Sequence, residues 1–293
     1  MKILVTGSES FIGKELIHQC LKKNISVRGC DLIDVKDPKY DFYKLDICSS
    51  NIPDELFNDI DCVVHLAALS RDSDCKGRSF DCFTTNVMGT LNLVNHIKKT
   101  NVKQLIFASS EWVYDKFEDN KEKDENAVID ITNLTSEYAL SKFVSECNLR
   151  QEFNNRFCNV TILRFGIIYG PRKSNWSAVE SILNQVKNKE KVSVGSLKTG
   201  RRFVHVSDIV KGIIHSFGLE GYNIINLTGN QINTLKEIID ISQIILNKKI
   251  EIFENNPKQI SIRNPSNLKA KEIINWEPKI DLKTGLESLL PYV

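Results

Sequence analysis

The sequence predicts an α/β fold, in which a doubly wound parallel sheet is followed by a smaller C-terminal lobe. Over the first 165 residues, short apolar runs alternate with amphipathic stretches, and this alternation is typical of parallel strands joined by crossover helices. The first apolar run leads directly into the glycine-spaced turn Gly7-Ser-Glu-Ser-Phe-Ile-Gly13 and then into a helical pattern. Beyond residue 164 the alternation loosens, which indicates that a second substructure begins there.

The elements of the first part follow from this alternation. Strands are predicted at residues 3–5, 26–30, 43–45, 62–66, 104–108 and 160–164. Helices are clearest at residues 11–22 and 80–99, where apolar residues recur with helical spacing. A third helix is expected at residues 136–153, with Thr135 or Ser136 as its N-cap. The charged stretch at residues 115–126 is interpreted as a solvated loop, and its place after a strand would also allow it to border an active site.

The second part of the chain begins where Gly170-Pro171 ends regular structure. Helices are expected at residues 176–187, from 208 onward, and at 234–246, 265–275 and 282–290, and strands at 192–194, 203–206 and 223–227. We therefore expect a sheet domain at residues 1–168, completed by about 203–230. The lobe for substrate binding is expected at 169–202 and 231–293, with a ligand cleft between the two at the carboxyl ends of the strands.

The composition is that of an ordinary globular chain of 293 residues, 41% hydrophobic and 26% charged. A net charge of +2 favours neither a nucleic acid nor a membrane surface as a partner. The first turn comes too early for a signal sequence, and no apolar run approaches the length of a membrane span, so a cytoplasmic protein is expected. The eight cysteines form no Cys-x-x-Cys pair, which favours reduced thiols over a metal site.

The turn between Gly7 and Gly13 has the spacing of a dinucleotide-binding loop. In such a loop, backbone amides and the N-terminus of the following helix bind a pyrophosphate. The middle glycine of the usual pattern is replaced by Ser10, and a glycine there normally lets the backbone approach the phosphates. The spacing alone therefore also fits a simple turn between a strand and a helix.

Asp31 ends the second strand, 24 residues after Gly7. A carboxylate at this place accepts hydrogen bonds from the adenosine ribose hydroxyls and repels a 2′-phosphate, so NAD is favoured over NADP. Arg28 precedes Asp31 by three residues and is expected in or beside the strand rather than facing a phosphate. The alternative for Asp31 is an ordinary turn residue at the end of a strand.

Tyr138 and Lys142 form a Tyr-x-x-x-Lys string, in which a phenol beside an ammonium can become a base near neutral pH. Two other strings of this form begin at Tyr40 and Tyr169, but turn signals beside them argue against a helix. At about 100° per residue, Tyr138 and Lys142 share one helix face. The nearly opposite face is apolar and carries Leu140, Phe143, Val144 and Cys147. The alternative is that the two polar residues lie on a solvated helix face.

A series of strings along essentially the whole chain matches one known family in order and spacing. The strings are Ile3-Leu-Val-Thr-Gly7, Val63-Val-His-Leu-Ala-Ala68, Thr85-Asn-Val-Met-Gly-Thr-Leu-Asn92, Phe107-Ala-Ser-Ser-Glu-Trp-Val-Tyr114, Tyr138 to Lys142, Leu163-Arg-Phe-Gly-Ile-Ile-Tyr-Gly-Pro171, Arg201-Arg-Phe-Val-His-Val206 with Asp208, and Asn275-Trp-Glu-Pro278. The sequence resembles the extended short-chain dehydrogenase/reductase family of NAD-dependent nucleotide-sugar epimerases and dehydratases. The resemblance implies a Rossmann fold, NAD as the cofactor, and a homodimer built through the helices that contain Tyr138 and Phe80.

The resemblance also implies roles for individual residues. Tyr138 is the expected catalytic base, Lys142 holds the nicotinamide ribose and lowers the pKa of Tyr138, and Ser110 hydrogen-bonds the reacting sugar oxygen. Glu111 is a candidate catalytic acid. The residues expected at the cofactor are Gly7, Ser10, Phe11, Ile12, Gly13, Asp31, Asp46, Ile47, Leu66, Ala67, Ala68, Asn86, Ser109, Tyr138 and Lys142. The residues expected at the substrate are Ser70, Ser110, Trp112, Ile167, Arg172, Arg201 and Arg263.

The residues that decide the product depart from the family pattern. In the dehydratases that this chain resembles, two acidic residues follow the serine. Here Glu111 fills the first place and Trp112 the second, so the full elimination pair is missing; a carboxylate facing solvent is the alternative for Glu111. Ile167 stands where many relatives have an asparagine, and Arg202 replaces a usual aspartate. A surface charge, rather than a diphosphate ligand, is the alternative for Arg172, Arg201 and Arg263.

The sequence therefore predicts an NAD-dependent enzyme that oxidises a sugar C4 hydroxyl to a ketone, with Tyr138 as base and no metal. The leading reaction is 4-epimerisation of a nucleoside-diphosphate hexose. A 4,6-dehydratase with Glu111 as acid and a 4-ketosugar reductase are the alternatives. An alternative of another class is a non-catalytic dinucleotide sensor, which has no need of a base. His65 and His205 are interpreted as packed or hydrogen-bonded rather than catalytic.

Overall fold

A seven-stranded sheet forms the centre of the computed structural model, which describes residues 1–114, 117 and 121–293. The strands run in the order β11-β6-β5-β4-β1-β2-β3, and the pairs from β3 through β5 are parallel. The order reverses at β1, as in doubly wound sheets, so the predicted fold class is confirmed. The strands are β1 Lys2–Thr6, β2 Ser26–Asp31, β3 Asp41–Lys44, β4 Cys62–His65, β5 Gln104–Ser110, β6 Asn159–Phe165 and β11 Tyr222–Leu227.

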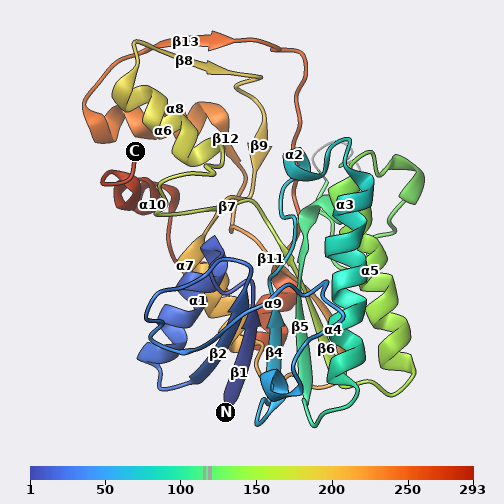
Figure 1. Cartoon of the computed structure of the whole chain (residues 1–293). Helices are drawn as coiled ribbons and strands as arrows, with labels where there is room; N and C mark the ends of the chain where they lie inside the picture. Colours follow the sequence, from blue (N-terminus) through green and yellow to red (C-terminus); the bar gives the residue numbers. More distant parts are fainter. Residues whose placement is uncertain (115–116, 118–120) are drawn as a thin grey trace. The chain divides into compact units, whose positions relative to one another are not determined.

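Helices cover both faces of this sheet. They are α1 Phe11–Lys22, α2 Asp72–Cys75, α3 Ser79–Phe83, α4 Gly89–Ile97 and α5 Glu137–Asn154, with 3-10 turns at Asp54–Phe57, Glu111–Val113 and Ile131–Asn133. Figure 1 shows α1 on one face of the sheet and α4 and α5 on the other. Apolar side chains from the strands and α4 meet in one core, which includes Leu4, Val63, Leu93, Leu105 and Ile162.

A π-helical turn, Thr84–Met88, interrupts the helix that was predicted at residues 80–99. The N–H of Gly89 bonds to the C=O of Thr84, an i to i+5 bond that widens the turn. Such turns occur frequently at functional sites, and this one carries Asn86, which is 1% exposed. The prediction of one continuous helix is wrong here, because hydrophobic spacing does not distinguish a π turn from an α turn.

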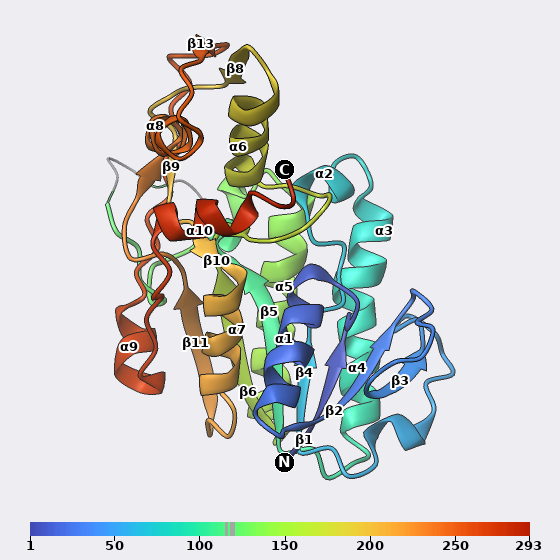
Figure 2. The ribbon, with the colours of Figure 1, turned by 90° about the vertical axis from the view of Figure 1, so that its left-hand side faces the viewer.

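The chain divides into two compact units. The first comprises residues 1–115, 128–164 and 213–225, and the second comprises 116–127, 165–212 and 226–293. The remaining elements are β7 Ile168–Tyr169, α6 Ala178–Asn188, β8 Lys191–Val194, β9 Gly200–Arg201, β10 Val204–His205, α7 Val206–His215, β12 Asn233–Thr234, α8 Leu235–Leu246, β13 Glu251–Glu254, α9 Leu268–Ile274 and α10 Leu282–Leu289. Within the second unit, α6 and α8 pack together (Figure 2) over a core that includes Leu183, Val186, Ile238, Ile239 and Leu286.

The charged stretch predicted at residues 115–126 packs within the second unit over its described part. Lys123 forms a β-bridge with Pro265, and its N–H bonds to the C=O of Asn264 at 3.1 Å. Glu125 is 8% exposed, and its carboxylate accepts the N–H of Asn226 at 2.7 Å. The interpretation as a solvated loop is therefore confirmed at Lys121, Glu122, Asp124 and Asn126, which are exposed, and is wrong at the buried Glu125. Residues 115, 116 and 118–120 lie outside the described part of the chain.

None of the described helices is long and apolar enough to cross a membrane. The eight cysteines are free thiols, and five of them are buried. Among the described residues, no three His, Cys, Asp or Glu side chains are grouped so that they could hold a metal ion.

Candidate active site

Helix α5 places Tyr138 and Lys142 together on its buried side. Their exposed fractions are 8% and 3%. Three further polar residues of α5 are buried, namely Ser141, Ser145 and Glu146. The opposite side is half-buried or exposed and carries Leu140, Phe143, Val144 and Cys147. The interpretation of Tyr138 and Lys142 as residues of a solvated helix face is therefore wrong, because α5 turns its polar side inward.

The first turn of α5 is fixed by hydrogen bonds to the loop around α2. Ser136 is the N-cap, and its Oγ accepts the N–H of Ala139 at 3.2 Å. The same hydroxyl donates to Asp72 at 2.5 Å. The carboxylate of Glu137 accepts the N–H of Gly77 at 3.1 Å, and an acidic residue in the first turn also complements the helix dipole. These contacts fix the first turn of α5 and therefore the position of Tyr138.

The hydroxyl of Ser110 interacts with that of Tyr138. Ser110 is the last residue of β5, is 6% exposed, and accepts the N–H of Trp112 at 3.2 Å. Burial raises the pKa of Tyr138 to about 12, and the interaction with Ser110 opposes this rise. Two hydroxyls from different elements thus converge on one point, as general acid–base chemistry at a substrate oxygen requires.

The ammonium group of Lys142 lies 5.9 Å from the ring centroid of Tyr138 and 4.8 Å from that of Phe107. Burial lowers the pKa of Lys142 to about 8, against the opposing effects of Cys82, Cys75 and Glu146. Lys142 is therefore still an ammonium at neutral pH and favours a phenolate on Tyr138. The burial of Tyr138 is the larger effect, so its pKa stands above, and not below, the ordinary value of a phenol.

Glu111 and Trp112 follow Ser110 in the 3-10 turn Glu111–Val113. Glu111 is fully buried, with an exposed fraction of 0%. The interpretation of Glu111 as a carboxylate that faces solvent is therefore wrong. Trp112 belongs to a small apolar cluster that also contains Leu69, Cys75, Cys82 and Tyr138. An indole thus packs against the cluster that contains the phenol, in the place where the dehydratases that the sequence resembles carry a second acidic residue.

The backbone of the glycine loop requires both terminal glycines. Gly7 has φ +69°, and a Cβ there would lie 2.7 Å from the N atom of Ala67. A Cβ on Gly13 would lie 2.3 Å from the carbonyl oxygen of Gly7. Ser10 has φ −66° and ψ 167°, which any residue adopts, and its Oγ accepts the N–H of Gly13 at 3.0 Å. The serine therefore replaces the middle glycine without backbone strain and serves as the N-cap of α1.

Asp31 ends β2 beside this loop. Its carboxylate accepts the N–H of Glu9 at 2.9 Å and that of Ile33 at 3.1 Å, so Asp31 ties the loop to the end of the strand. Arg28 is 7% exposed, and its Nε lies 2.6 Å from Asp41. The interpretation of Arg28 as a strand residue that does not face a phosphate is confirmed.

Asn86 joins the segment after β4 to α5. Its amide accepts the N–H of Leu69 at 2.9 Å, donates to the C=O of Leu69 at 3.1 Å, and donates to the Oγ of Ser141 at 2.9 Å. Ser141 precedes Lys142, so Asn86 supports the helix turn that carries the lysine. Thr6 accepts the N–H groups of Leu66 and Ala67. The predicted residues at the ends of β1, β2, β4 and β5 therefore lie at one edge of the sheet, because the carboxyl ends of parallel strands meet there.

The other predicted residues of the first unit are placed as follows. Phe11 and Ile12 form the first turn of α1 and are half-buried. Asp46 accepts the N–H of Cys48 at 2.8 Å, and the C=O of Ile47 accepts the side chain of Asn92 at 2.8 Å. Ser109 is buried and donates to Glu146, whereas Ala68 is half-buried and Ser70 is exposed.

Two of the predicted arginines lie side by side in the second unit. Gly200 and Ile262 form a β-bridge, which brings the residues that follow them, Arg201 and Arg263, next to each other. Arg201 donates to the C=O of Ser261 at 2.6 Å, and the guanidinium of Arg263 lies 5.9 Å from the ring centroid of Phe117. Ile167 packs against the apolar core of this unit.

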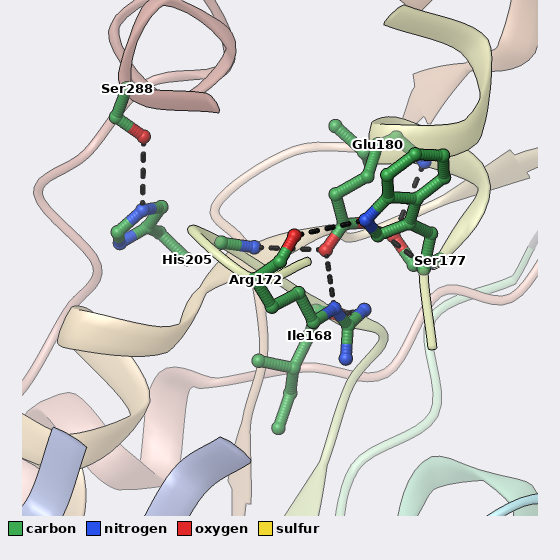
Figure 3. Close-up of polar contacts among 9 residues, drawn as sticks. Ile168, Arg172, Ser177, Glu180, His205 and Ser288 are labelled. Atoms are coloured by element: carbon green, nitrogen blue, oxygen red, sulfur yellow. Dashed lines mark hydrogen bonds and ion pairs between the residues drawn. The ribbon is translucent and has the colours of Figure 1, made fainter. Parts of the chain in front are cut away.

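Arg172 forms an ion pair inside the second unit (Figure 3). Its Nε lies 2.8 Å from the carboxylate of Glu180, which is 0% exposed. The same carboxylate accepts the N–H groups of Gly170 and Ser177 at 3.2 and 2.9 Å. The alternative of a simple surface charge is therefore wrong for Arg172, which holds together the turn after β7 and the start of α6.

The two histidines are structural, as predicted. His65 is 1% exposed and bonds to Thr6 and Thr90 through its two ring nitrogens at 2.7 and 3.0 Å. His205 accepts the N–H of Ser207 at 3.2 Å and contacts Ser288 at 3.4 Å (Figure 3).

A family model described as NAD dependent epimerase/dehydratase family matches residues 3–227. The chain belongs to this family. This match confirms the resemblance to the extended short-chain dehydrogenase/reductases. It also confirms that the protein is an NAD-dependent enzyme of the epimerase/dehydratase type, with NAD as its cofactor.

Individual members of the family resemble the chain over nearly its whole length. It is 27% identical to a UDP-glucuronate 4-epimerase of Thermodesulfobacterium geofontis, over 97% of this chain and 93% of the relative. It is 26% identical to UDP-glucuronic acid decarboxylase 6 of Arabidopsis thaliana, over 98% and 87%. The crystal structure of the Thermus thermophilus UDP-glucose 4-epimerase in complex with NAD matches the fold with a TM-score of 0.87 and 24% identity, over 100% of this chain and 98% of that chain.

Two features near Tyr138 in this epimerase/dehydratase were missed by sequence reasoning. Glu146 lies on the buried side of α5 with Tyr138 and Lys142, and its spacing of four residues from Lys142 was a readable signal. Cys75 and Cys82 pack against Tyr138. They come from α2 and α3 and meet α5 only in the folded chain, so no sequence spacing predicts their contact with Tyr138.

Proposed function

We propose that this family member catalyses the 4-epimerisation of a nucleoside-diphosphate hexose with Tyr138 as the catalytic base. The observation that carries the proposal is the meeting of the Tyr138 and Ser110 hydroxyls beside the ammonium of Lys142. At the point where the two hydroxyls converge, a sugar C4 hydroxyl can give its proton to Tyr138 while Ser110 holds its oxygen.

Tyr138 must lose its own proton before it can act as a base. Because burial opposes this ionisation, the phenolate needs positive charge nearby, and Lys142 supplies one such charge. Bound NAD⁺ supplies the hydride acceptor for C4 and a second positive charge on its nicotinamide ring. Tyr138 keeps the proton while the ketosugar turns, and returns it when the hydride is delivered to the other face.

The glycine loop and Asp31 are proposed to hold the cofactor. The N-terminus of α1 and the amides from Gly7 to Gly13 suit a pyrophosphate. Asp31 already accepts the N–H groups of Glu9 and Ile33, but a carboxylate offers about four acceptor sites, so it can also accept ribose hydroxyls. The other predicted residues at the carboxyl ends of the strands complete this site.

The first unit is thus proposed as the cofactor domain and the second as the substrate lobe. The pair Arg201 and Arg263 is proposed to bind a diphosphate, because the two arginines occupy neighbouring positions after the Gly200–Ile262 bridge and guanidinium groups suit that ligand. Arg172 is proposed to act on the substrate only through the turn that it shares with Glu180, since that ion pair already uses its charge.

Epimerisation is favoured over 4,6-dehydration by the surroundings of Tyr138. Glu111 is buried directly after Ser110 and could serve as the single acid of a dehydratase. Elimination also calls for a second acidic group, and in that place the apolar Trp112 packs against the cluster that contains Tyr138. An epimerase needs no acid or base beyond Tyr138, which fits this arrangement.

A homodimer through α3, the π turn and α5 is part of the proposal. Phe80 and Met88 are 82% and 59% exposed, and the outer side of α5 carries Leu140, Phe143 and Val144. Exposed apolar groups on neighbouring helices suit contact with a second copy of the chain.

The proposal is tested by incubating the protein and NAD⁺ with UDP-, dTDP-, GDP- and CDP-hexoses. We expect an inverted C4 centre with no net consumption of cofactor, and the Tyr138→Phe variant should lose about 10²–10⁴-fold in kcat while still binding NAD⁺. A stable 4-keto-6-deoxy product would favour the dehydratase, and stoichiometric use of NADH the reductase. Retained turnover in the variant would remove Tyr138 as the base, and NAD⁺ binding with no turnover of any sugar would favour the sensor.

A further inference from the structure

Glu146 is the third member of a buried polar row on α5. Tyr138, Lys142 and Glu146 follow one another at intervals of four residues, so they lie one above the other along the helix. Glu146 is 3% exposed. Its carboxylate receives three side-chain hydrogen bonds from neighbouring strands, one from Ser109 and two from Arg164.

These bonds tie the carboxylate to the strand that ends in Ser110. The Oγ of Ser109 donates to Glu146 Oε1 at 2.5 Å. From β6, Arg164 donates through Nε to Oε1 at 3.0 Å and through Nη2 to Oε2 at 2.6 Å. The guanidinium of Arg164 lies 4.9 Å from the ring centroid of the buried Tyr114. Glu146 therefore connects α5, β5 and β6 at Ser109, the residue that precedes Ser110.

A buried ion pair is weak evidence of a contribution to stability. Removing two charges from water costs several kcal/mol per ion, and apolar replacements of similar volume are often neutral or stabilising. Stability alone therefore does not account for Glu146 and Arg164. Glu146 lies one helical turn from Lys142, and it bonds to both Ser109 and Arg164. This position indicates a role in the active site.

The groups that face Lys142 come from every element packed around it. They are Cys75 on α2, Cys82 on α3, His65 on β4, Phe107 on β5, and Tyr138 and Glu146 on α5. Burial raises the pKa of Cys75 to about 12 and lowers that of His65 to about 3, so both are neutral near pH 7. Among these groups Glu146 brings a carboxylate, whose negative charge favours the ammonium form of Lys142.

We propose that Glu146 is a positioning residue of this site, which keeps Lys142 charged and holds the Ser109-Ser110 end of β5 against α5. The inference rests on the proposed function of Tyr138 and Lys142. The two parts are separable, since the charge acts through Lys142 and the hydrogen bond acts through Ser109.

The charge is tested by nuclear magnetic resonance titration of protein labelled at the lysine ε-carbon, with the signal of Lys142 identified by its loss in Lys142→Arg. We expect Lys142 to titrate near pH 8 in the wild type and about 1 pH unit lower in Glu146→Gln. Glu146→Asp, which keeps the charge, should titrate as the wild type. An unchanged titration of Lys142 in Glu146→Gln would overturn the proposal.

The matched control is Asp41→Asn, which removes the partner of Arg28 in the same unit and should leave the titration of Lys142 unchanged. If Glu146→Gln does not fold because Arg164 is left unpaired, the double variant Glu146→Gln/Arg164→Met replaces it. Glu146 lies on the same helix as Lys142, one turn away, whereas Arg164 reaches the carboxylate from β6. The downward shift should therefore persist in the double variant, and its absence would refute the role of the charge.

The positioning part is tested with Ser109→Ala, which leaves the ion pair intact. We expect kcat to fall severalfold with KM for the sugar nucleotide unchanged; equal kcat would remove Ser109 from the inference. The titration needs no substrate, so it can succeed or fail independently of the proposed reaction. If Tyr138→Phe stays active, the proposed function fails, whatever the titration of Lys142 shows.

Discussion

The hydroxyl of Ser10 accepts a hydrogen bond from the N–H of Gly13 at 3.0 Å, so the middle position of the glycine loop is occupied by a helix cap. We expect Ser10→Ala to lower the free energy of unfolding by about 1 kcal/mol and Ser10→Gly by only a few tenths. Urea denaturation measures both. Ser10→Thr, which keeps the hydroxyl, is the control. Equal stability of Ser10→Ala and wild type would show that the bond contributes nothing.

The activity should fall at alkaline pH through Lys142. Burial lowers the pKa of Lys142 to about 8, so the ammonium is present below that pH and is lost as the pH rises through it. We expect kcat to decrease about tenfold per unit above that pKa. Lys142→Arg, which stays charged, should be slower at every pH but show no such decrease. The same decrease in that variant would assign it to another group.

Asp31 should set the preference for NAD. Asp31→Ala removes an acceptor of the proposed ribose bonds, and we expect Kd for NAD⁺ to rise roughly ten- to a hundredfold. Kd for NADP⁺ should change less, because the repulsion of a 2′-phosphate is lost as well. Asp31→Asn separates the two effects, since it keeps an acceptor and removes the charge. Calorimetric titration with both nucleotides decides, and an unchanged ratio of affinities would refute the assignment.

His65 should make the protein sensitive to acid. Burial lowers its pKa from 6.5 to about 3, so between these values the unfolded chain takes up a proton that the folded chain does not, and stability is lost as the pH falls. Between about pH 7 and pH 5 this linkage removes about 2 kcal/mol of unfolding free energy. The loss over this interval should be smaller by that amount in His65→Gln. Equal pH dependence of wild type and variant would show that His65 is not the group responsible.

The exposed apolar residue Phe80 should lie in the dimer contact. We expect Phe80→Glu to convert the proposed dimer to a monomer in sedimentation equilibrium, because a carboxylate would be buried against the second copy. Ile244→Glu on α8, where the side chain is 70% exposed, is the matched control and should remain dimeric. A dimer that survives Phe80→Glu would place the contact elsewhere.

The main elements could be predicted from the sequence because their signals are local. Helix α1 was predicted at the residues that it occupies, and α5 within one residue at each end, since both have helical spacing and a cap residue precedes α5. The glycine loop and Asp31 could also be recognised from the sequence, because their signals are local as well.

Other features depend on contacts between distant segments and have no local signal. The π turn at Asn86 accompanies bonds to Leu69 and Ser141, and residues 121–126 pack against residues 264–266. Helix periodicity also sorts the two faces of α5 correctly but cannot tell which one is buried. Hydropathy alone would put the apolar face inside.

The buried polar residues of α5 serve turnover at a cost in thermal stability. Apolar side chains in place of Lys142, Glu146 and Arg164 would fill the same space without the desolvation of three charges. Selection for heat resistance alone would therefore favour their loss and yield a protein that is harder to unfold and catalytically inert. Engineering for stability should therefore leave these three positions fixed.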